Sequence, residues 1–139
     1  MRFRVLLAGA LAVVVAAVVA GRADADNAET PSIKQVMVKL HKGANAPVGK
    51  LKGELKGEKP NWDTIQKQTK EIVVLSAALA KNEPSKGDAA SWKKLSDEYF
   101  QDAKALDDAA QAKDLAAAKT AHGRLSASCK ACHSVHKGK

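Results

Sequence analysis

The sequence predicts an all-α protein that folds as an antiparallel, up-down-up-down four-helix bundle. Beyond residue 25, apolar side chains recur at alternating spacings of three and four, which is the helical period. Sustained alternation of apolar and polar residues is missing there, and β-branched residues are few, so strands are not expected. Clusters of proline, glycine and asparagine separate the helical segments by short connections, which favour antiparallel neighbours.

Residues 1–25 have the pattern of a cleaved secretory signal peptide. Two arginines near the start precede the unbroken apolar run Val5–Ala20, and Ala23 and Ala25 are small residues at the positions that a signal peptidase reads. The run is short for a membrane span, which needs about 20 residues. We therefore expect a periplasmic protein whose mature domain is 26–139, without stable membrane insertion after cleavage. A retained membrane anchor is the alternative.

Composition limits the classes of partner. The chain has a formal net charge of +8, but its basic residues are spread along the sequence and lack interleaved aromatic residues, so nucleic acid is not an expected ligand. An acidic redox partner protein is compatible with this charge. Aromatic residues make up only 4% of the chain. A small domain with so few large side chains has a thin core, which a bulky cofactor would help to fill.

The first helix is predicted to begin at Thr30, an N-cap residue followed by a proline in the first turn. Residues 43–47 contain glycine, asparagine and proline and are expected to interrupt or kink it. A weaker continuation with two internal glycines reaches the turn at 57–60. The apolar stripe of the first part consists of Ile33, Val36, Met37 and Leu40.

Three further helices follow with clear boundaries. The second is predicted to open near Asn61 and to end in the breaker cluster 82–87, while Asp88 and Asp114 are suited to cap the third and fourth. The inner faces are Trp62, Ile65, Thr69, Ile72, Ser76 and Leu79 in the second helix, Trp92, Leu95, Tyr99, Ala103, Leu106 and Ala110 in the third, and Leu115, Ala118, His122, Leu125, Cys129, Cys132 and His136 in the fourth.

The only two cysteines of the chain, Cys129 and Cys132, lie on the last helix, and His133 follows directly. At about 100° per residue these three side chains fall on one arc of the interior face, so two thiols and an imidazole converge. A disulfide, a zinc site completed by His122 or His136, a thiol redox pair and covalent haem attachment all use such groups.

Covalent haem attachment uses all three groups, because two thiols bond the porphyrin and the histidine ligates the iron. A disulfide between residues three apart closes almost no loop, and a zinc site needs four ligands. A thioredoxin-like redox pair usually opens a helix after a strand, whereas this pair closes a helix. One covalently attached haem c is therefore the favoured cofactor, with the other three readings as alternatives.

The stretch 127–133, Ala-Ser-Cys-Lys-Ala-Cys-His, resembles the haem motif of class II c-type cytochromes, which comprise cytochrome c′ and its low-spin, six-coordinate relatives. The Gly-Glu-Lys-Pro turn at 57–60 and Trp92 near the start of the third helix are also similar to that family. The resemblance covers 33–137, nearly all of the mature domain. Of these features, the haem motif is the most specific.

The resemblance implies roles for particular residues. Cys129 and Cys132 would hold the haem as thioethers, and His133 would be the proximal iron ligand. Lys137 stands where the family often has a basic residue beside that histidine, a charge that would tune the reduction potential. His136 departs from the family, which usually has an aromatic residue there. The family also implies a homodimer formed through the first two helices of the bundle.

The bundle topology predicts which side chains meet the haem. The start of the first helix lies beside the end of the last, and the end of the second and the start of the third reach the same end. The candidate haem pocket is therefore Ile33, Val36, Met37, Leu40, Ile72, Leu75, Leu79, Trp92 and Leu95. Ordinary core packing would give the same pattern for most of these. We expect His122 to be a core or partly exposed residue, and His136 to have a solvent role in a short, frayed tail.

The sixth coordination position decides between two functions. Met37 and His41 are the ligand-type side chains of the first helix, and helical phase places Met37 about 50° and His41 about 90° from the centre of the apolar stripe. Met37 is therefore the predicted distal ligand and His41 the runner-up, although the family's usual spacing from the turn at 57–60 falls nearer His41. A sixth ligand suits single-electron transfer, whereas an open, five-coordinate site would bind nitric oxide or another small gas. We expect the electron carrier and no enzyme, because no nucleophile–base pair is visible.

Overall fold

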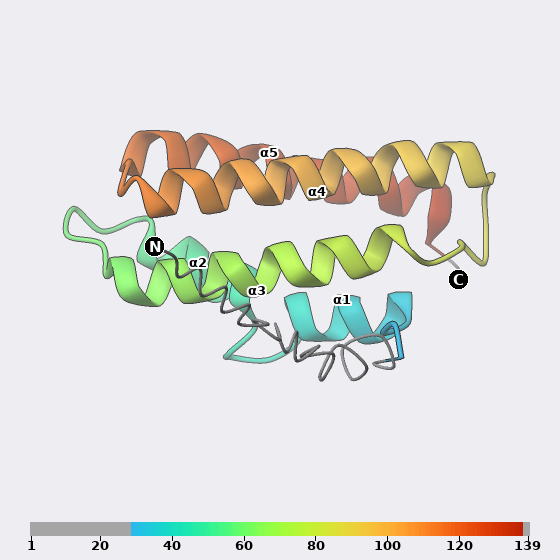
Figure 1. The fold of residues 1–139 in the computed structure, drawn as a ribbon, viewed down its shortest axis with the longest axis horizontal. Helices are drawn as coiled ribbons and strands as arrows, with labels where there is room; N and C mark the ends of the chain where they lie inside the picture. The colour runs from blue at the N-terminus through green and yellow to red at the C-terminus, as the bar shows by residue number, and fades with distance from the viewer. Residues whose placement is uncertain (1–28, 138–139) are drawn as a thin grey trace, which may run out of the picture.

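The computed structural model describes residues 29–137, so the predicted signal peptide lies outside the described residues. Within 29–137 the chain forms helices and no strand, which confirms the all-α prediction and the four-helix bundle (Figure 1). The five helices are α1 (Ile33–His41), α2 (Pro47–Glu54), α3 (Trp62–Ala80), α4 (Ala89–Gln111) and α5 (Leu115–His136). The two short helices α1 and α2 together form the first arm, and α3, α4 and α5 form the other three.

The first arm is divided by backbone geometry between α1 and α2. Gly43 has a φ of +96°, a conformation that glycine adopts without steric cost. Pro47 occupies the first turn of α2, where its fixed φ favours a new helix and its missing N–H is not needed. The predicted interruption at 43–47 therefore separates two helices.

Polar N-caps define where the helices begin. The expected cap at Thr30 is wrong: Ser32 caps α1, because Gln35 lies three residues later and completes a capping box. The Ser32 hydroxyl accepts from the Gln35 N–H at 3.3 Å, and the Gln35 Oε1 accepts from the Ser32 N–H at 2.7 Å. The caps predicted at Asp88 and Asp114 are confirmed, and Asn61, near which α3 was expected to begin, is the N-cap of that helix.

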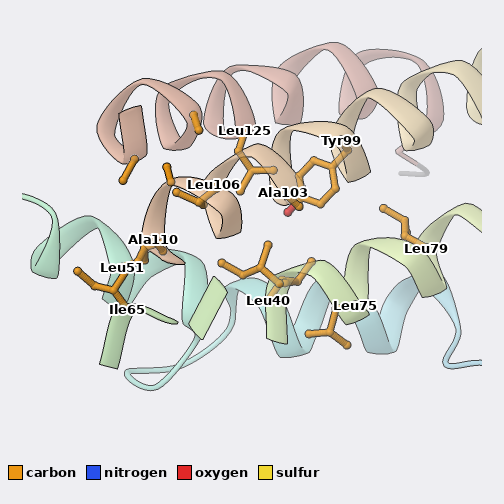
Figure 2. Packing of buried hydrophobic residues seen from close by; sticks show 14 of the residues in the cluster. Leu40, Leu51, Ile65, Leu75, Leu79, Tyr99, Ala103, Leu106, Ala110 and Leu125 are labelled. Carbon is orange, nitrogen blue, oxygen red and sulfur yellow. The ribbon is translucent and has the colours of Figure 1, made fainter. Parts of the chain in front are cut away.

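The hydrophobic core lies between the helices along the length of the bundle (Figure 2). Its fully buried large side chains come from all five helices, and small residues on α4 and α5 let these two pack closely. The fully buried large apolar residues are Val36, Leu40, Leu51, Ile65, Ile72, Leu106 and Leu125. The buried alanines of α4 and α5 are Ala103, Ala109, Ala110, Ala118 and Ala121.

One end of the bundle gathers segments that are distant in the sequence. The start of α1, the end of α3, the start of α4 and the end of α5 meet there, and the end of α5 lies beside the α3–α4 connection (Figure 1). The main packing contacts of α1 are with α2 and α3, while α5 packs chiefly against α4. Among the described residues, no helix combines the length and apolar character that a membrane crossing requires.

Candidate cofactor site

A cavity of about 700 Å³ opens at this end of the bundle. Its volume is within the range of cofactor-binding pockets, and its walls come from α1, α3, α4, α5 and the α3–α4 connection. The lining residues are Ile33, Lys34, Met37, His41, Leu79, Ser85, Trp92, Leu95, Ser96, Tyr99, Ser128, Cys129, Cys132, His133, His136 and Lys137. The cavity therefore brings together the thiols, three imidazoles and the thioether of Met37.

Cys129 and Cys132 are free, half-buried thiols on the wall formed by α5. The Cys129 Sγ lies 3.6 Å from the carbonyl oxygen of Leu125, one turn earlier. Burial raises the pKa of both thiols, so at neutral pH they are protonated and uncharged. A reactive redox pair needs a thiol whose own pKa is lowered, so that the thiolate is present at neutral pH. The environment of these two thiols therefore does not support a reactive redox pair.

A zinc site would need several ligands at one point. Within residues 29–137, no group of three or more histidine, cysteine, aspartate or glutamate side chains is close enough to hold a metal ion. Cys129, Cys132 and His133 line the same cavity but do not form such a group. This arrangement fits a group larger than a single ion.

Two potential iron ligands face the cavity from α1. Met37 is half-buried and packs against the core, whereas His41 at the end of α1 is exposed on one side. The pKa of His41 is lowered, first by burial of part of the ring and second by the charge of His133. The lowered pKa favours the neutral imidazole, which is the form that ligates metals.

The predicted pocket residues divide into two groups. Those that line the cavity are Ile33, Met37, Leu79, Trp92 and Leu95. Those that do not line it are Val36, Leu40 and Ile72, which are completely buried in the core, and Leu75, which borders a separate hollow beside α2. The difference has a packing cause: α1 lies against α3, so Val36, Leu40 and Ile72 lie in the core rather than on the cavity wall.

Tyr99 is a cavity residue that the sequence analysis placed only on the inner face of its helix. It lies two turns after Trp92 on α4, a spacing that could have indicated its place in the pocket. Its side chain is 6% exposed, and its hydroxyl is a buried group without a hydrogen-bond partner among the described residues. Burial, followed by the nearby Cys129 and Cys132, raises the pKa of Tyr99, which keeps the phenol protonated.

An unpartnered buried hydroxyl on a cavity wall indicates a bound group. Buried polar atoms in native proteins are nearly always hydrogen-bonded, and a polar atom of a ligand would satisfy the Tyr99 phenol. The largely apolar lining, the cavity volume, the two neutral thiols and the imidazole of His133 suit a large planar cofactor with polar edges. The residues present therefore fit haem.

The expectation for His136 is wrong. Instead of facing solvent in a frayed tail, His136 ends α5 as a buried residue, 7% exposed. Its Nδ1 lies 2.8 Å from the carbonyl oxygen of Lys86, its Nε2 lies 3.1 Å from the Ser91 Oγ, and its ring meets Trp92 edge-on. The sequence did contain a signal for this burial, because the inner-face residues of the last helix recur at spacings of three and four residues as far as His136.

A four-helix bundle with two thiols and an imidazole on one wall of a large apolar cavity is the framework of a helical haem protein. The family model described as cytochrome c′ matches residues 32–137. This chain belongs to the cytochrome c′ family, and it is accordingly a haem-binding protein whose cofactor is covalently attached haem c with its iron.

Solved structures resemble the described fold. The cytochrome c′ from Thermochromatium tepidum has a TM-score of 0.56 and 25% identity, with 67% of this chain and 84% of that chain covered. A cytochrome c′ with an unusual ligand-controlled dimer dissociation has a TM-score of 0.55 and 23% identity, with 66% and 84% covered, a likeness that concerns the fold alone. No curated protein matches the sequence.

Proposed function

We propose that this protein is a periplasmic cytochrome that carries single electrons through its haem. The observation that carries the proposal is the presence of two ligand-type side chains of α1, Met37 and His41, in the same cavity as His133 of α5. Haem iron supplies a one-electron redox couple when it is bound, and two axial protein ligands suit electron transfer. We propose a carrier rather than an enzyme.

The proposed attachment uses three residues of α5. Cys129 and Cys132 would hold the haem as thioethers, and His133 would be the proximal ligand. The thiols are available for this role because they are uncharged and unpaired with one another. The apolar side chains of Ile33 and Leu79 would limit the access of water, and the Tyr99 phenol would donate a hydrogen bond to a polar atom of the bound group.

Met37 is the proposed distal ligand, with His41 as the runner-up. Met37 is the more buried of the two and packs against the core, which restrains its side chain. His41 lies at the end of α1, although its lowered pKa keeps the imidazole ready for ligation. An open position, which would move the function to the binding of nitric oxide or another small gas, is the third candidate.

Visible and electron paramagnetic resonance spectra of the purified ferric and ferrous protein test the proposal. We expect low-spin ferric haem with the charge-transfer band of a methionine ligand, and we expect that band to be lost in Met37→Leu, which preserves volume but removes the sulfur. His41→Gln is the matched variant. Low-spin spectra that survive Met37→Leu but not His41→Gln would make the site bis-histidine. A high-spin ferric spectrum of the unmutated protein would contradict the electron-transfer proposal in favour of gas binding.

The charge around the cavity supports an acidic redox partner. Lys34 and Lys137 line the cavity, and the chain as a whole has a net charge of +8. Positive groups at the mouth of a redox site steer an acidic protein toward it, and this steering weakens as salt screens the charges. Reversal of both charges, Lys34→Glu with Lys137→Glu, should slow electron exchange with acidic partners and reduce its salt dependence.

Export and dimerisation complete the proposal. Residues 1–25 support export, and the mature N-terminus, determined on protein from the periplasm, should be Asp26.

A homodimer through the α1 and α3 side of the bundle is supported by two exposed apolar residues, Val38 at 44% and Val74 at 68% exposure. Sedimentation analysis should then show a dimer that Val74→Glu dissociates; an unchanged monomer in both proteins would contradict it.

A further inference from the structure

The imidazole of His136 has a partner for each ring nitrogen. The carbonyl oxygen of Lys86 can only accept, so the Nδ1 of His136, 2.8 Å away, carries a proton and donates it. When the ring is neutral, the Nε2 can therefore accept from the Ser91 hydroxyl, 3.1 Å away. The last residue of α5 is thereby bonded to the α3–α4 connection and to the first turn of α4.

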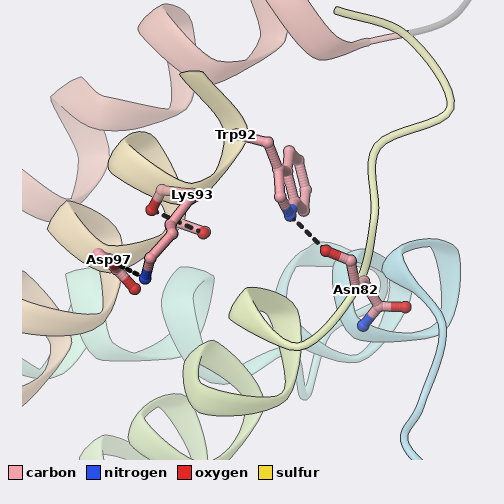
Figure 3. A network of polar contacts seen from close by, with 5 residues as sticks. Asn82, Trp92, Lys93 and Asp97 are labelled. Atoms are coloured by element: carbon pink, nitrogen blue, oxygen red, sulfur yellow. Dashed lines mark hydrogen bonds and ion pairs between the residues drawn. The ribbon is translucent and has the colours of Figure 1, made fainter. Parts of the chain in front are cut away.

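The same ring is part of a longer series of contacts. The rings of His136 and Trp92 have centroids 5.3 Å apart and an interplanar angle of 82°. The Trp92 Nε1 donates to the carbonyl oxygen of Asn82 at 2.7 Å (Figure 3), and the Asn82 side chain donates to the carbonyl oxygen of Pro31 at 3.0 Å. These contacts cross the cavity end of the bundle from α5 to the residue that precedes the α1 cap.

Gly87 shows how closely the α3–α4 connection approaches the ring. Its φ is +84°, and a Cβ at this position would lie 2.5 Å from the Nδ1 of His136 and 2.7 Å from its Cε1. Carbon atoms do not approach a ring so closely, so any side chain at Gly87 would displace His136 or the connection. The backbone at Gly87 leaves space for the imidazole only because glycine has no Cβ.

We propose that His136 is a positioning residue for the proximal histidine. His133 and His136 belong to the same final turn of α5, and within 29–137 the only backbone bond beyond that turn is the Lys137 N–H to the His133 carbonyl oxygen at 3.3 Å. A helix end with so little support frays unless side chains hold it. His136 fixes this turn against Lys86, Ser91 and Trp92, and thereby restrains His133 and limits the access of water to its side of the cavity. The inference rests on the proposed role of His133 as the iron ligand.

Substitutions at two separate positions test this role. His136→Ala removes the ring, and Gly87→Ala displaces it from the other side of the contact. Gly43→Ala is the matched control, because Gly43 also has a positive φ but has no neighbour within 4 Å of an added Cβ. The readouts on the haem-loaded proteins are hydrogen exchange of the amides in 133–137 and the reduction potential of the haem.

Both substitutions should speed exchange in 133–137 by roughly fivefold or more, which is the factor for the loss of one net hydrogen bond. They should also lower the reduction potential, because water near the proximal side stabilises the more highly charged oxidised iron. Gly43→Ala should leave exchange in 133–137 unchanged. His136→Gln, which can donate to Lys86 and accept from Ser91, should restore much of the protection.

The outcomes separate this inference from the proposed function. If every variant carries covalent haem but exchange in 133–137 and the potential match those of the unmutated protein, His136 has no positioning role, while the attachment stands. If Gly43→Ala changes both readouts as much as Gly87→Ala, backbone strain is the cause and the inference is overturned. If the unmutated protein carries no covalent haem, the proposed function fails first, and the mass of the purified chain reveals this before any variant is compared.

Discussion

The indole Nε1 of Trp92 donates a 2.7 Å hydrogen bond to the main-chain carbonyl of Asn82 (Figure 3). Asn82 follows the C-terminus of α3, where carbonyl groups lack helical partners, and Trp92 lies in the first turn of α4. The bond therefore joins two consecutive helices across the α3–α4 connection. Trp92 also lines the cofactor cavity. The same side chain therefore forms part of the cavity wall and holds the α3–α4 connection in place.

Trp92→Phe should lower the free energy of unfolding by about 1–3 kcal/mol, because it leaves the Asn82 carbonyl without its partner in a part-buried position. Lys93→Ala is the control on the next residue. It removes the ion pair between Lys93 and Asp97, whose side chains are 77% and 49% exposed, respectively. Because the pair is exposed, the substitution should lower the free energy of unfolding by about 0.5 kcal/mol or less. Urea unfolding of both variants measures the difference, and equal costs would contradict the role given to the indole.

Removal of the cysteines should change how the haem is held. The mature protein should weigh one haem more than its peptide, and denaturation should not release the cofactor. Cys129→Ala should retain a single thioether through Cys132, whereas the double variant Cys129→Ala, Cys132→Ala should release its haem on denaturation. Mass spectrometry under denaturing conditions is the measurement. A mass equal to the bare chain, or to the chain less two protons, would show that the haem assignment of this pair is wrong.

Tyr99→Phe tests whether the Tyr99 hydroxyl donates a hydrogen bond to the bound haem. If a polar atom of the bound haem accepts a hydrogen bond from the Tyr99 hydroxyl, the variant should destabilise the haem-loaded protein by about 1 kcal/mol. If the hydroxyl stays without a partner, its removal should leave stability unchanged or raise it, since an unsatisfied buried group is itself costly. The sign of the change in the urea midpoint of the haem-loaded protein therefore decides whether Tyr99 contacts the cofactor.

The pH dependence of stability should include a contribution from His122, outside the cavity. Burial lowers its pKa, a backbone interaction with Val48 opposes the shift, and the charge of Lys52 lowers the pKa further. The folded chain therefore holds this proton less tightly than the unfolded chain, whose histidine titrates near 6.5. Stability should fall as the pH decreases through 6.5 and then level off below the folded pKa. His122→Gln should flatten this part of the profile measured by urea unfolding, and an identical profile would contradict the assignment.

The sequence by itself determined the helices and the chemistry of the site. The helical spacing of the apolar residues and the polar N-caps predicted where α3, α4 and α5 lie. Each of these helices combines a polar N-cap with a long apolar stripe, and both signals are local in the sequence. The spacing of Cys129, Cys132 and His133 placed three groups on one helix face, which is also a local property. The cap at Ser32 was missed because the apparent Thr-Pro signal outweighed the capping box formed with Gln35.

Only the tertiary structure decided which side chains border the cavity. Val36 and Met37 are neighbours in sequence, yet one is fully buried in the core and the other faces the cavity. That division depends on the angle at which α1 lies on α3, which no periodicity in a single helix specifies. The burial of His136 likewise could not be predicted from its own helix alone. Its burial depends on a backbone approach at Gly87, 49 residues earlier, where the absence of a Cβ leaves space for the ring. Contacts between distant segments are set by packing, and they are not visible in the sequence of either segment alone.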